Sequence, residues 1–167
     1  MRCCMLLGCL VLLCLANRAG AQQAIVIHGS DFGKHNQLFF VDSLWFFHAG
    51  ELPGGSRAAT TTAGWDTLHS PSFGKTNAPR HWSGMGWFGL WIKLDTGLVN
   101  RKLFMSINHD GASEIFMDGK PLGGFGIVGH SAQQMQAIRA PRELMPLWIA
   151  DTRPHLLTVR YSNFFGV

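Results

Sequence analysis

Bulky apolar residues alternate with other residues along several short stretches in the second half of the chain. In residues 103–108 the odd positions hold leucine, methionine and isoleucine, whereas the even positions hold phenylalanine, serine and asparagine. A period of two places these sets on opposite faces of an extended strand. Residues 157–162 alternate in the same way, and residues 114–117 form a short, mostly apolar run. The pattern predicts half-buried antiparallel strands in this region.

Turn-forming residues separate these predicted strands. Asp118-Gly119 is typical of a hairpin turn, and His109-Asp110-Gly111 predicts a tight turn in which the glycine adopts positive φ. The glycine-rich residues 123–129 disfavour a long helix, because each glycine costs about 1 kcal/mol relative to alanine in a helix interior. Residues 132–138 are compatible with a short helical turn.

The first half of the chain is aromatic-rich and less regular. Residues 38–41 and 44–47 predict the first strand, because Pro53-Gly54-Gly55 breaks any helix soon after them. Residues 50–86 are rich in Gly, Ser, Thr, Pro and Asn and predict a long irregular connection pinned by aromatic side chains. Residues 86–95 predict the next strand.

The N-terminus has the three parts of a secretory signal peptide. Arg2 supplies a positive charge, residues 5–16 are apolar, and Ala19-Gly20-Ala21 provides small residues for cleavage. We therefore expect residues 1–21 to be removed and residues 22–167 to form one exported domain, on the periplasmic or extracellular side of the membrane.

Two other roles for this N-terminal segment fit less well. A membrane anchor needs about 18 or more apolar residues, and Asn17 and Arg18 interrupt the run. A lipoprotein signal at Leu6-Leu7-Gly8-Cys9 would cut inside the apolar run.

Cysteine positions and charge narrow the classes of chemistry and partner. All four cysteines lie in the leader, so the mature chain would have no disulfide and no thiol chemistry; they are Cys3, Cys4, Cys9 and Cys14. Removal of Arg2 and Arg18 lowers the formal net charge from +4 to +2, because 12 Lys and Arg then face 10 Asp and Glu. With no Lys/Arg cluster in the sequence, we expect no nucleic-acid partner.

Two segments, Ala112–Leu122 and His155–Asn163, resemble the core of galactose-binding-like jelly rolls. The family pattern pairs an aromatic-x-Asp-Gly-Lys strand with a later Leu-x-Val-Arg-x-x-Asn strand, and both stand in this sequence. Such domains precede family 2 glycoside hydrolases and bacterial sensor proteins. The amino-acid sequence of these two segments is most similar to that of the extracellular input domain of sensor histidine kinases and related seven-transmembrane signalling proteins. Gly89 takes the place of an arginine that is usual in the family.

The resemblance implies a fold and a set of possible functions. The fold would be an all-β, antiparallel jelly-roll β-sandwich over about Leu38–Asn163. The function would be that of a ligand-sensing input domain of a two-component sensor kinase, with no chemistry of its own and with C-terminal membrane and output domains missing from this chain. The alternative is a carbohydrate-binding accessory module of a secreted glycoside hydrolase, and a third possibility is a scaffold without a ligand.

Motifs of enzymes and metal sites are weak in this sequence. Gly129-His130-Ser131 imitates a nucleophile elbow, but Gln133 replaces its second glycine and only 36 residues follow Ser131. The eight histidines form neither His-x-His nor His-Glu-x-x-His. A glycosidase carboxylate pair cannot be recognised by spacing, and Asp118 is explained as the turn former. We predict no catalytic residue, no metal and no cofactor.

Ligand-binding candidates are aromatic and polar residues in predicted loops. Trp65 and Trp82 are tryptophans in polar loops, where an indole can stack on a sugar ring or pack over the sheet ends. Trp87 and Trp91 would instead share one strand face in the core. For a small polar or carbohydrate ligand the predicted site residues are Trp65, His69, Trp82, His109, Asp110 and His130.

Overall fold

The computed structural model describes residues 24–32, 44–69, 78–139 and 143–165. Within these ranges the secondary structure consists of strands and two short 3-10 helices, which confirms the all-β class. No helix there is long and apolar enough to cross a membrane. The predicted signal peptide and the predicted strand at 38–41 lie outside these ranges. The strands are β1 (Ile25–Ile27), β2 (Leu44–Ala49), β3 (Asp66–His69), β4 (Met85–Leu94), β5 (Leu103–Met105), β6 (Asp110–Met117), β7 (Lys120–Phe125), β8 (Ile138–Arg139), β9 (Met145–Leu147) and β10 (His155–Ser162), and the helices are η1 (Gly29–Asp31) and η2 (Gly55–Arg57).

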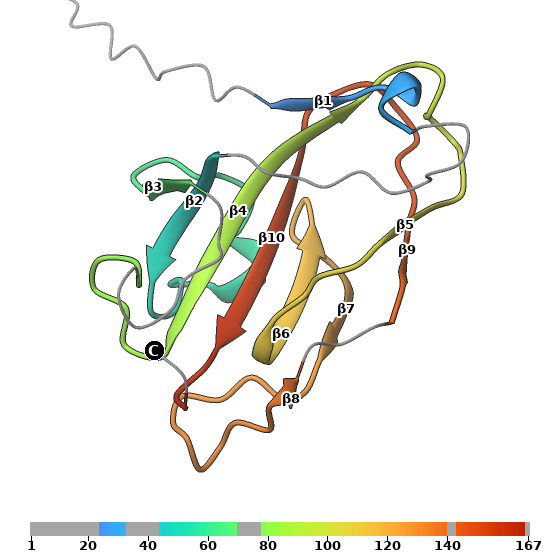
Figure 1. Ribbon diagram of the computed structural model, residues 1–167. Coiled ribbons are helices and arrows are strands. Elements are labelled where there is room, and N and C mark those ends of the chain that lie inside the picture. Colours follow the sequence, from blue (N-terminus) through green and yellow to red (C-terminus); the bar gives the residue numbers. More distant parts are fainter. Residues whose placement is uncertain (1–23, 33–43, 70–77, 140–142, 166–167) are drawn as a thin grey trace, which may run out of the picture.

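Most of these strands form one large sheet with β4 and β10 at its centre (Figure 1). Its order is β3-β2-β4-β10-β6-β7, with β1 beside β4 and β8 beside β6. β4 and β10 pair antiparallel, with Met85 opposite Ser162 and Ile92 opposite His155. β1 runs parallel to the end of β4, whereas the resemblance implied an entirely antiparallel sheet. β5 and β9 form a separate two-stranded sheet.

The main hydrophobic core lies between the large sheet and the β5–β9 sheet. Alternate residues of β4 and β10, such as Leu90 and Val159, point toward Met145 and Leu147 of β9. Each of these side chains is less than a tenth exposed. Full burial of an apolar side chain of this size contributes about 1.5–3 kcal/mol, so the core holds the two sheets together. The arrangement confirms a β-sandwich.

The opposite face of the large sheet is covered by the loop between β2 and β3, and we call it the loop-covered face. Trp87 and Phe116 of the sheet stack at a centroid distance of 5.6 Å. Leu52 and Ala59 of the loop complete this smaller cluster, and Trp65 packs against it. The predicted core position of Trp87 is confirmed. Trp91 is half-buried on the same face.

Several sequence predictions about turns and strands are confirmed. Asp118 and Gly119 have φ of 50° and 75° and join β6 to β7 as a two-residue hairpin. The strand predicted at 86–95 is β4. In residues 103–108 the odd positions are half-buried and the even positions exposed, as alternation requires, although the strand itself ends at Met105.

Two predictions are wrong. Asp110 and Gly111 do not form a turn with His109, because β6 begins at Asp110. At Gly111, with φ of 133°, a Cβ would stand 2.5 Å from the carbonyl oxygen of Ser162, so this glycine permits the close approach of β10. The connection predicted over residues 50–86 is not wholly irregular, because β3 forms within it and pairs with β2.

Local structure also differs in the glycine-rich segment. β7 occupies the first part of residues 123–129. The predicted helical turn is limited to a single turn in which the backbone N–H groups of Gln134 and Met135 donate to Ser131 O. Residues 138–139 form β8 instead.

Asp95 fastens the end of β4 to the segment that follows β1. Its carboxylate accepts hydrogen bonds from the backbone N–H groups of Gly29 at 2.9 Å, Gly97 at 2.9 Å and Leu98 at 3.2 Å. The bond from Gly29, together with the other two and the nearby His28, outweighs desolvation and lowers the pKa of Asp95. The carboxylate form is therefore favoured in the folded chain.

Acidification below about pH 4 is expected to destabilise the protein partly through Asp95. An aspartate in the unfolded chain has a pKa of about 3.9, and the folded-state pKa is lower. The contribution of Asp95 is therefore complete above about pH 4 and is lost as the pH falls through the folded pKa. Urea unfolding at a series of pH values should show that the free energy of unfolding falls less steeply below about pH 4 for Asp95→Asn than for the unaltered chain.

Candidate functional site

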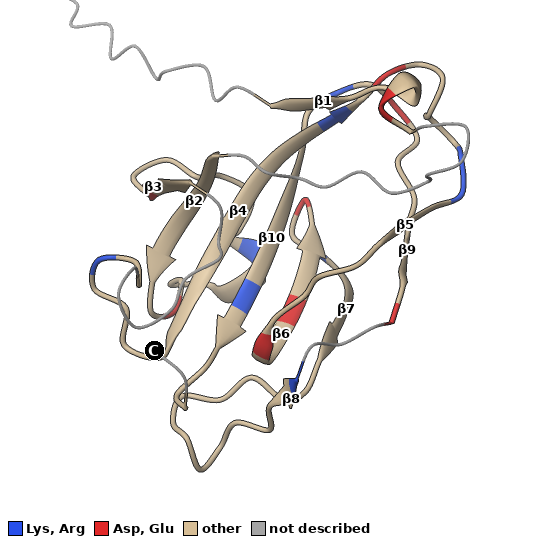
Figure 2. Cartoon of the chain, in the orientation of Figure 1, with Lys and Arg blue, Asp and Glu red and all other residues tan. Residues whose placement is uncertain are grey.

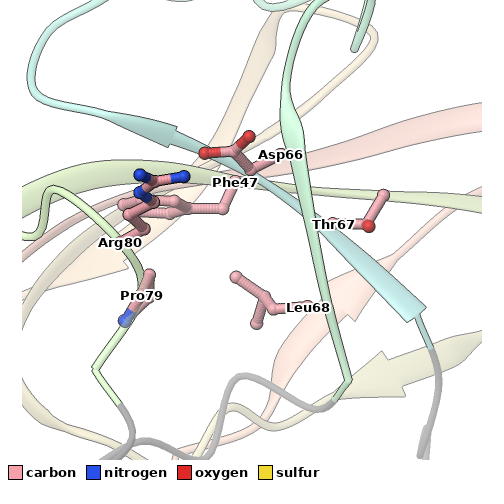
Figure 3. Close-up of a pocket in the computed structure, with 6 residues that line it drawn as sticks. All are labelled: Phe47, Asp66, Thr67, Leu68, Pro79 and Arg80. Carbon is pink, nitrogen blue, oxygen red and sulfur yellow. The ribbon is translucent and has the colours of Figure 1, made fainter.

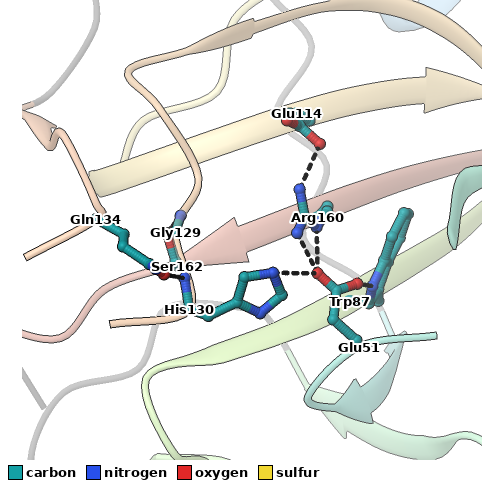
Figure 4. Close-up of polar contacts among 8 residues, drawn as sticks. All are labelled: Glu51, Trp87, Glu114, Gly129, His130, Gln134, Arg160 and Ser162. Atoms are coloured by element: carbon teal, nitrogen blue, oxygen red, sulfur yellow. Dashed lines mark hydrogen bonds and ion pairs between the residues drawn. The ribbon is translucent and has the colours of Figure 1, made fainter. Parts of the chain in front are cut away.

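Arg160 of β10 is the centre of a polar cluster on the loop-covered face (Figure 4). Its Nε donates to Glu51 Oε1 at 2.7 Å, its Nη2 bonds the same oxygen, and its Nη1 donates to Glu114 Oε2 at 3.0 Å. Trp87 Nε1 donates to Glu51 Oε2 at 3.2 Å. His130 Nε2 lies 3.9 Å from Glu51 Oε1 at the rim. The cluster joins three sheet strands, β4, β6 and β10, to two loops.

Electrostatics keep Arg160 charged in this position. Burial disfavours the guanidinium cation, but the hydrogen bonds to Glu51 and Glu114 and their charges outweigh it, so the pKa of Arg160 is raised. The Arg160 side chain is 17% exposed, and its guanidinium donates to both carboxylates. Three of its five N–H donors are bound to these carboxylates, and we interpret the cluster as a structural clamp.

A second polar contact joins His109 to Ser113 of β6. Its Nε2 lies 2.8 Å from Ser113 Oγ, and its ring contacts Tyr161 at 5.3 Å and Phe125 at 6.1 Å. Burial lowers the pKa of His109, and this effect outweighs the negative charge of Asp110, which acts to raise it. Ser113 is 1% exposed, so the pair cannot present a serine nucleophile to a substrate in this conformation.

His155 is held between two carboxylates at the start of β10. Its Nδ1 lies 2.7 Å from Asp118 Oδ2 and its Nε2 lies 3.1 Å from Asp151 Oδ1. Asp118 Oδ1 also accepts the backbone N–H of Leu156 at 2.9 Å. Asp118 is therefore both the predicted turn former and an anchor for β10. Both ring nitrogens of the buried histidine are occupied.

A half-open recess of about 300 Å³ lies at the edge of the large sheet (Figure 3). Asp66, Thr67 and Leu68 of β3 form one wall, and Pro79 and Arg80 form the other. Figure 3 shows the Asp66 carboxylate and the Arg80 guanidinium on the same side, with Leu68 and Pro79 below them. Phe47 of β2 completes the lining. The recess combines an apolar floor with hydrogen-bonding groups of both charges.

The predicted site residues do not converge on one point. Trp82 stacks on Tyr161 at 5.7 Å and also packs against Phe47 and Phe88. Trp65 is half-buried, with its ring 5.8 Å from that of His48. Both tryptophans thus pack over the sheet, which is the structural role predicted for them beside stacking on a sugar ring.

Three predicted site residues lie close in sequence to residues that line the recess. Trp65 immediately precedes Asp66, His69 is the exposed last residue of β3, and Trp82 follows Arg80 by two positions. His109 and Trp82 meet on the ring of Tyr161, inside the structure.

His130 and Asp110 lie elsewhere. His130 is at the rim of the Arg160 cluster, in a loop where its backbone N–H donates to Gln134 Oε1 and that of Gly129 donates to Ser162 Oγ. Asp110 starts β6 and pairs loosely with Arg139 at 3.9 Å. Ser131 accepts the turn hydrogen bonds through its carbonyl, so it occupies a turn that leaves the glycine-rich segment. A ligand role for any of the six residues stays a prediction.

Sequence reasoning missed Asp66, Arg80 and the exposed aromatic residues Trp148 and Phe104. Nothing in the spacing of Asp66 and Arg80 indicates that they meet. Nothing in the sequence marks Trp148 as exposed either, because residues 144–149 are apolar at both odd and even positions. In the described part of the chain, no three His, Cys, Asp or Glu side chains are grouped so as to hold a metal ion.

Comparison with known proteins bears on the fold. No protein-family model and no curated protein matches the sequence significantly. Solved structures do match. A calcium-binding mutant of Bacteroides uniformis β-glucuronidase 2 has a TM-score of 0.54 and 20% identity, over 74% of this chain and 14% of that one. Ruminococcus gnavus β-glucuronidase has a TM-score of 0.53 and 15% identity, over 74% and 20%. The same enzyme in complex with D-glucuronic acid has a TM-score of 0.52 and 15% identity, over 74% and 21%.

This chain shares its fold with part of these glycoside hydrolases. The similarity supports the galactose-binding-like jelly roll that the sequence implies. The more specific resemblance to sensor kinases is not shown by these comparisons. The chain spans only 14–21% of the length of the proteins in these three structures, so the activity of the two enzymes belongs to much longer proteins.

Proposed function

We propose that this chain is a non-catalytic, carbohydrate-binding β-sandwich module of the kind that accompanies glycoside hydrolases, exported by its N-terminal leader. The fold shared with β-glucuronidases supports this class over a sensor input domain. The observation that carries the proposal is the recess beside β3, and we propose it as the sugar site. The sensor function stays a prediction, which membrane and kinase segments in a longer parent protein would favour.

The recess has the dimensions and chemistry for one sugar ring. Its volume of about 300 Å³ is at the lower end of small-ligand pockets. The Asp66 carboxylate can accept bonds from two adjacent hydroxyl groups, and the Arg80 guanidinium can donate to ring or hydroxyl oxygens. Leu68 and Pro79 offer an apolar surface to the C–H face of the sugar. Polar groups on one side and apolar groups on the other match the two-sided character of a pyranose.

The same residues argue for binding without hydrolysis. Glycoside hydrolysis ordinarily uses two carboxylic groups about 5–10 Å apart across the glycosidic bond. Among the described residues that line the recess, Asp66 is the single carboxylate. One carboxylate beside a guanidinium is suited to recognising hydroxyl groups. The recess lacks the second carboxylate that hydrolysis would need as its base or nucleophile.

The test is a binding measurement with variants of the recess. A glycan array of the purified chain identifies the preferred sugar, and calorimetry then measures its Kd. We expect Asp66→Asn and Arg80→Gln each to weaken binding about tenfold or more, because a hydrogen bond to a charged group contributes about 1.5–3 kcal/mol.

Asp110→Asn and Arg139→Gln provide matched controls, because this ion pair is 66% and 90% exposed and lies outside the recess; a sugar site in the recess therefore excludes Asp110 from the predicted site residues. Both should keep the Kd of the unaltered chain. Recognition of no glycan, or equal losses in the control pair, would contradict the proposed function.

A further inference from the structure

The outer face of the β5–β9 sheet carries exposed aromatic and apolar side chains. Phe104 of β5 is 50% exposed, and Trp148, which follows β9 directly, is 64% exposed. Leu144 is 59% exposed on the same side, whereas the alternate residues Met145 and Leu147 are in the core. This face lies at the opposite edge of the molecule from the recess (Figure 1).

The strand register places a cation beside the Phe104 ring and opposite Trp148. Leu103 pairs with Leu147 and Phe104 with Pro146. One step further along the same antiparallel register, Lys102 is opposite Trp148. Phe104 is then the diagonal neighbour of Trp148, at the roughly 7–8 Å separation usual for such pairs. Lys102 Nζ lies 5.4 Å from the centroid of the Phe104 ring.

The charges at this face are arranged along its length. Arg101 and Lys102 precede β5, beside the end of β9 that carries Trp148, and Glu143 precedes β9 at the other end. Figure 2 shows the basic and acidic segments at opposite ends of the β5–β9 pair. Two basic residues therefore adjoin the aromatic end.

A ligand that covers this end must contact the aromatic rings and must also replace the hydrogen bonds that water makes to the ammonium group of Lys102. An uncharged apolar partner would strip water from the ammonium group without replacing its hydrogen bonds, which is costly. A sugar acid supplies both needed parts. Its C–H face can stack on an indole or phenyl ring, and its carboxylate can pair with the ammonium group.

We propose that Trp148, Phe104 and Lys102 form a second glycan-binding surface, which takes an anionic, uronate-bearing polysaccharide. The exposed rings bind successive parts of the chain, and Lys102 pairs with a uronate carboxylate between them. The surface is separate from the recess, so each site can fail without the other.

Polygalacturonate and its fully methyl-esterified form are the probes, because they share one backbone and differ in charge. Binding to immobilised polymer is measured by interferometry for the purified chain. We expect binding to polygalacturonate, at least tenfold weaker binding to the ester, and a loss of at least tenfold with Trp148→Ala or Phe104→Ala. Lys102→Gln should remove the preference for the acid and keep the binding of the ester.

Matched controls separate this surface from other exposed aromatic residues and from other exposed cations. Phe165→Ala removes a ring that is 70% exposed elsewhere, and Arg139→Gln removes a cation that is 90% exposed elsewhere. Both should leave polygalacturonate binding unchanged, and circular dichroism should show that the Trp148 and Phe104 variants stay folded. Absence of binding, equal binding of acid and ester, or a dimer in light scattering that Trp148→Ala dissociates would each overturn the proposal.

Discussion

Gly89→Arg is expected to lower the free energy of unfolding by about 3 kcal/mol or more. Gly89 lies on the loop-covered face of β4, where the family pattern has an arginine. A Cβ at this position would stand 2.8 Å from Thr62 Cγ2 and 3.2 Å from Trp65 Cζ3. An arginine would therefore displace the loop and bury a charge against the Trp65 ring. Urea unfolding followed by tryptophan fluorescence measures the loss.

A second substitution shows whether the loop is the cause. Trp65→Ala removes the ring that covers Gly89, so it should destabilise the unaltered chain but cost less in the Gly89→Arg background. Such non-additivity is expected for residues in direct contact. Gly29→Ala is the matched control, because its Cβ would meet no atom closer than 4.0 Å. Strict additivity of Trp65→Ala and Gly89→Arg would show that the cost arises elsewhere.

Arg160→Met should lower the free energy of unfolding by about 2–3 kcal/mol at neutral pH. The substitution keeps most of the apolar stem but leaves the carboxylates of Glu51 and Glu114, which are 32% and 45% exposed, without their shared cation. Their partial exposure to water keeps the loss below the 3–5 kcal/mol typical of fully buried pairs. Arg160→Lys should recover only part of it, because one ammonium group cannot reproduce the planar fork that bonds both carboxylates.

Chemical denaturation of these variants is the measurement, with Arg139→Gln as the control. Arg139 is 90% exposed and its nearest carboxylate contact is 3.9 Å long, so its removal should leave the urea midpoint unchanged. If Arg160→Met is as stable as the control, the cluster is not a clamp and its groups are available for a ligand.

The sequence predicted those parts of the fold that depend on neighbouring residues. Alternation along 103–108 gave the correct faces, and the Asp118-Gly119 hairpin followed from the ease with which these residues adopt positive φ. Gly111 was misassigned to a turn because a glycine that permits close strand approach has the same sequence signature as a glycine in a turn.

The candidate sites could not be predicted in this way, because their residues come together only through strand pairing and loop packing. Asp66 and Arg80 meet at a recess although 14 positions separate them. Arg160 and Glu51 are 109 positions apart. Trp82, chosen as a ligand-binding residue for its polar neighbours in sequence, packs against Phe47 and Tyr161 from distant strands.

By itself the sequence determined the all-β class, the hairpin turn, and the strands that carry the family pattern, since each follows from local backbone preferences and a period of two. The tertiary structure alone decided which tryptophans are covered and which are exposed. Trp65 and Trp82 lie in polar loops yet pack over the sheet, whereas Trp148 follows a buried strand yet is 64% exposed. Exposure depends on what the rest of the chain places over a side chain, and local sequence does not record it.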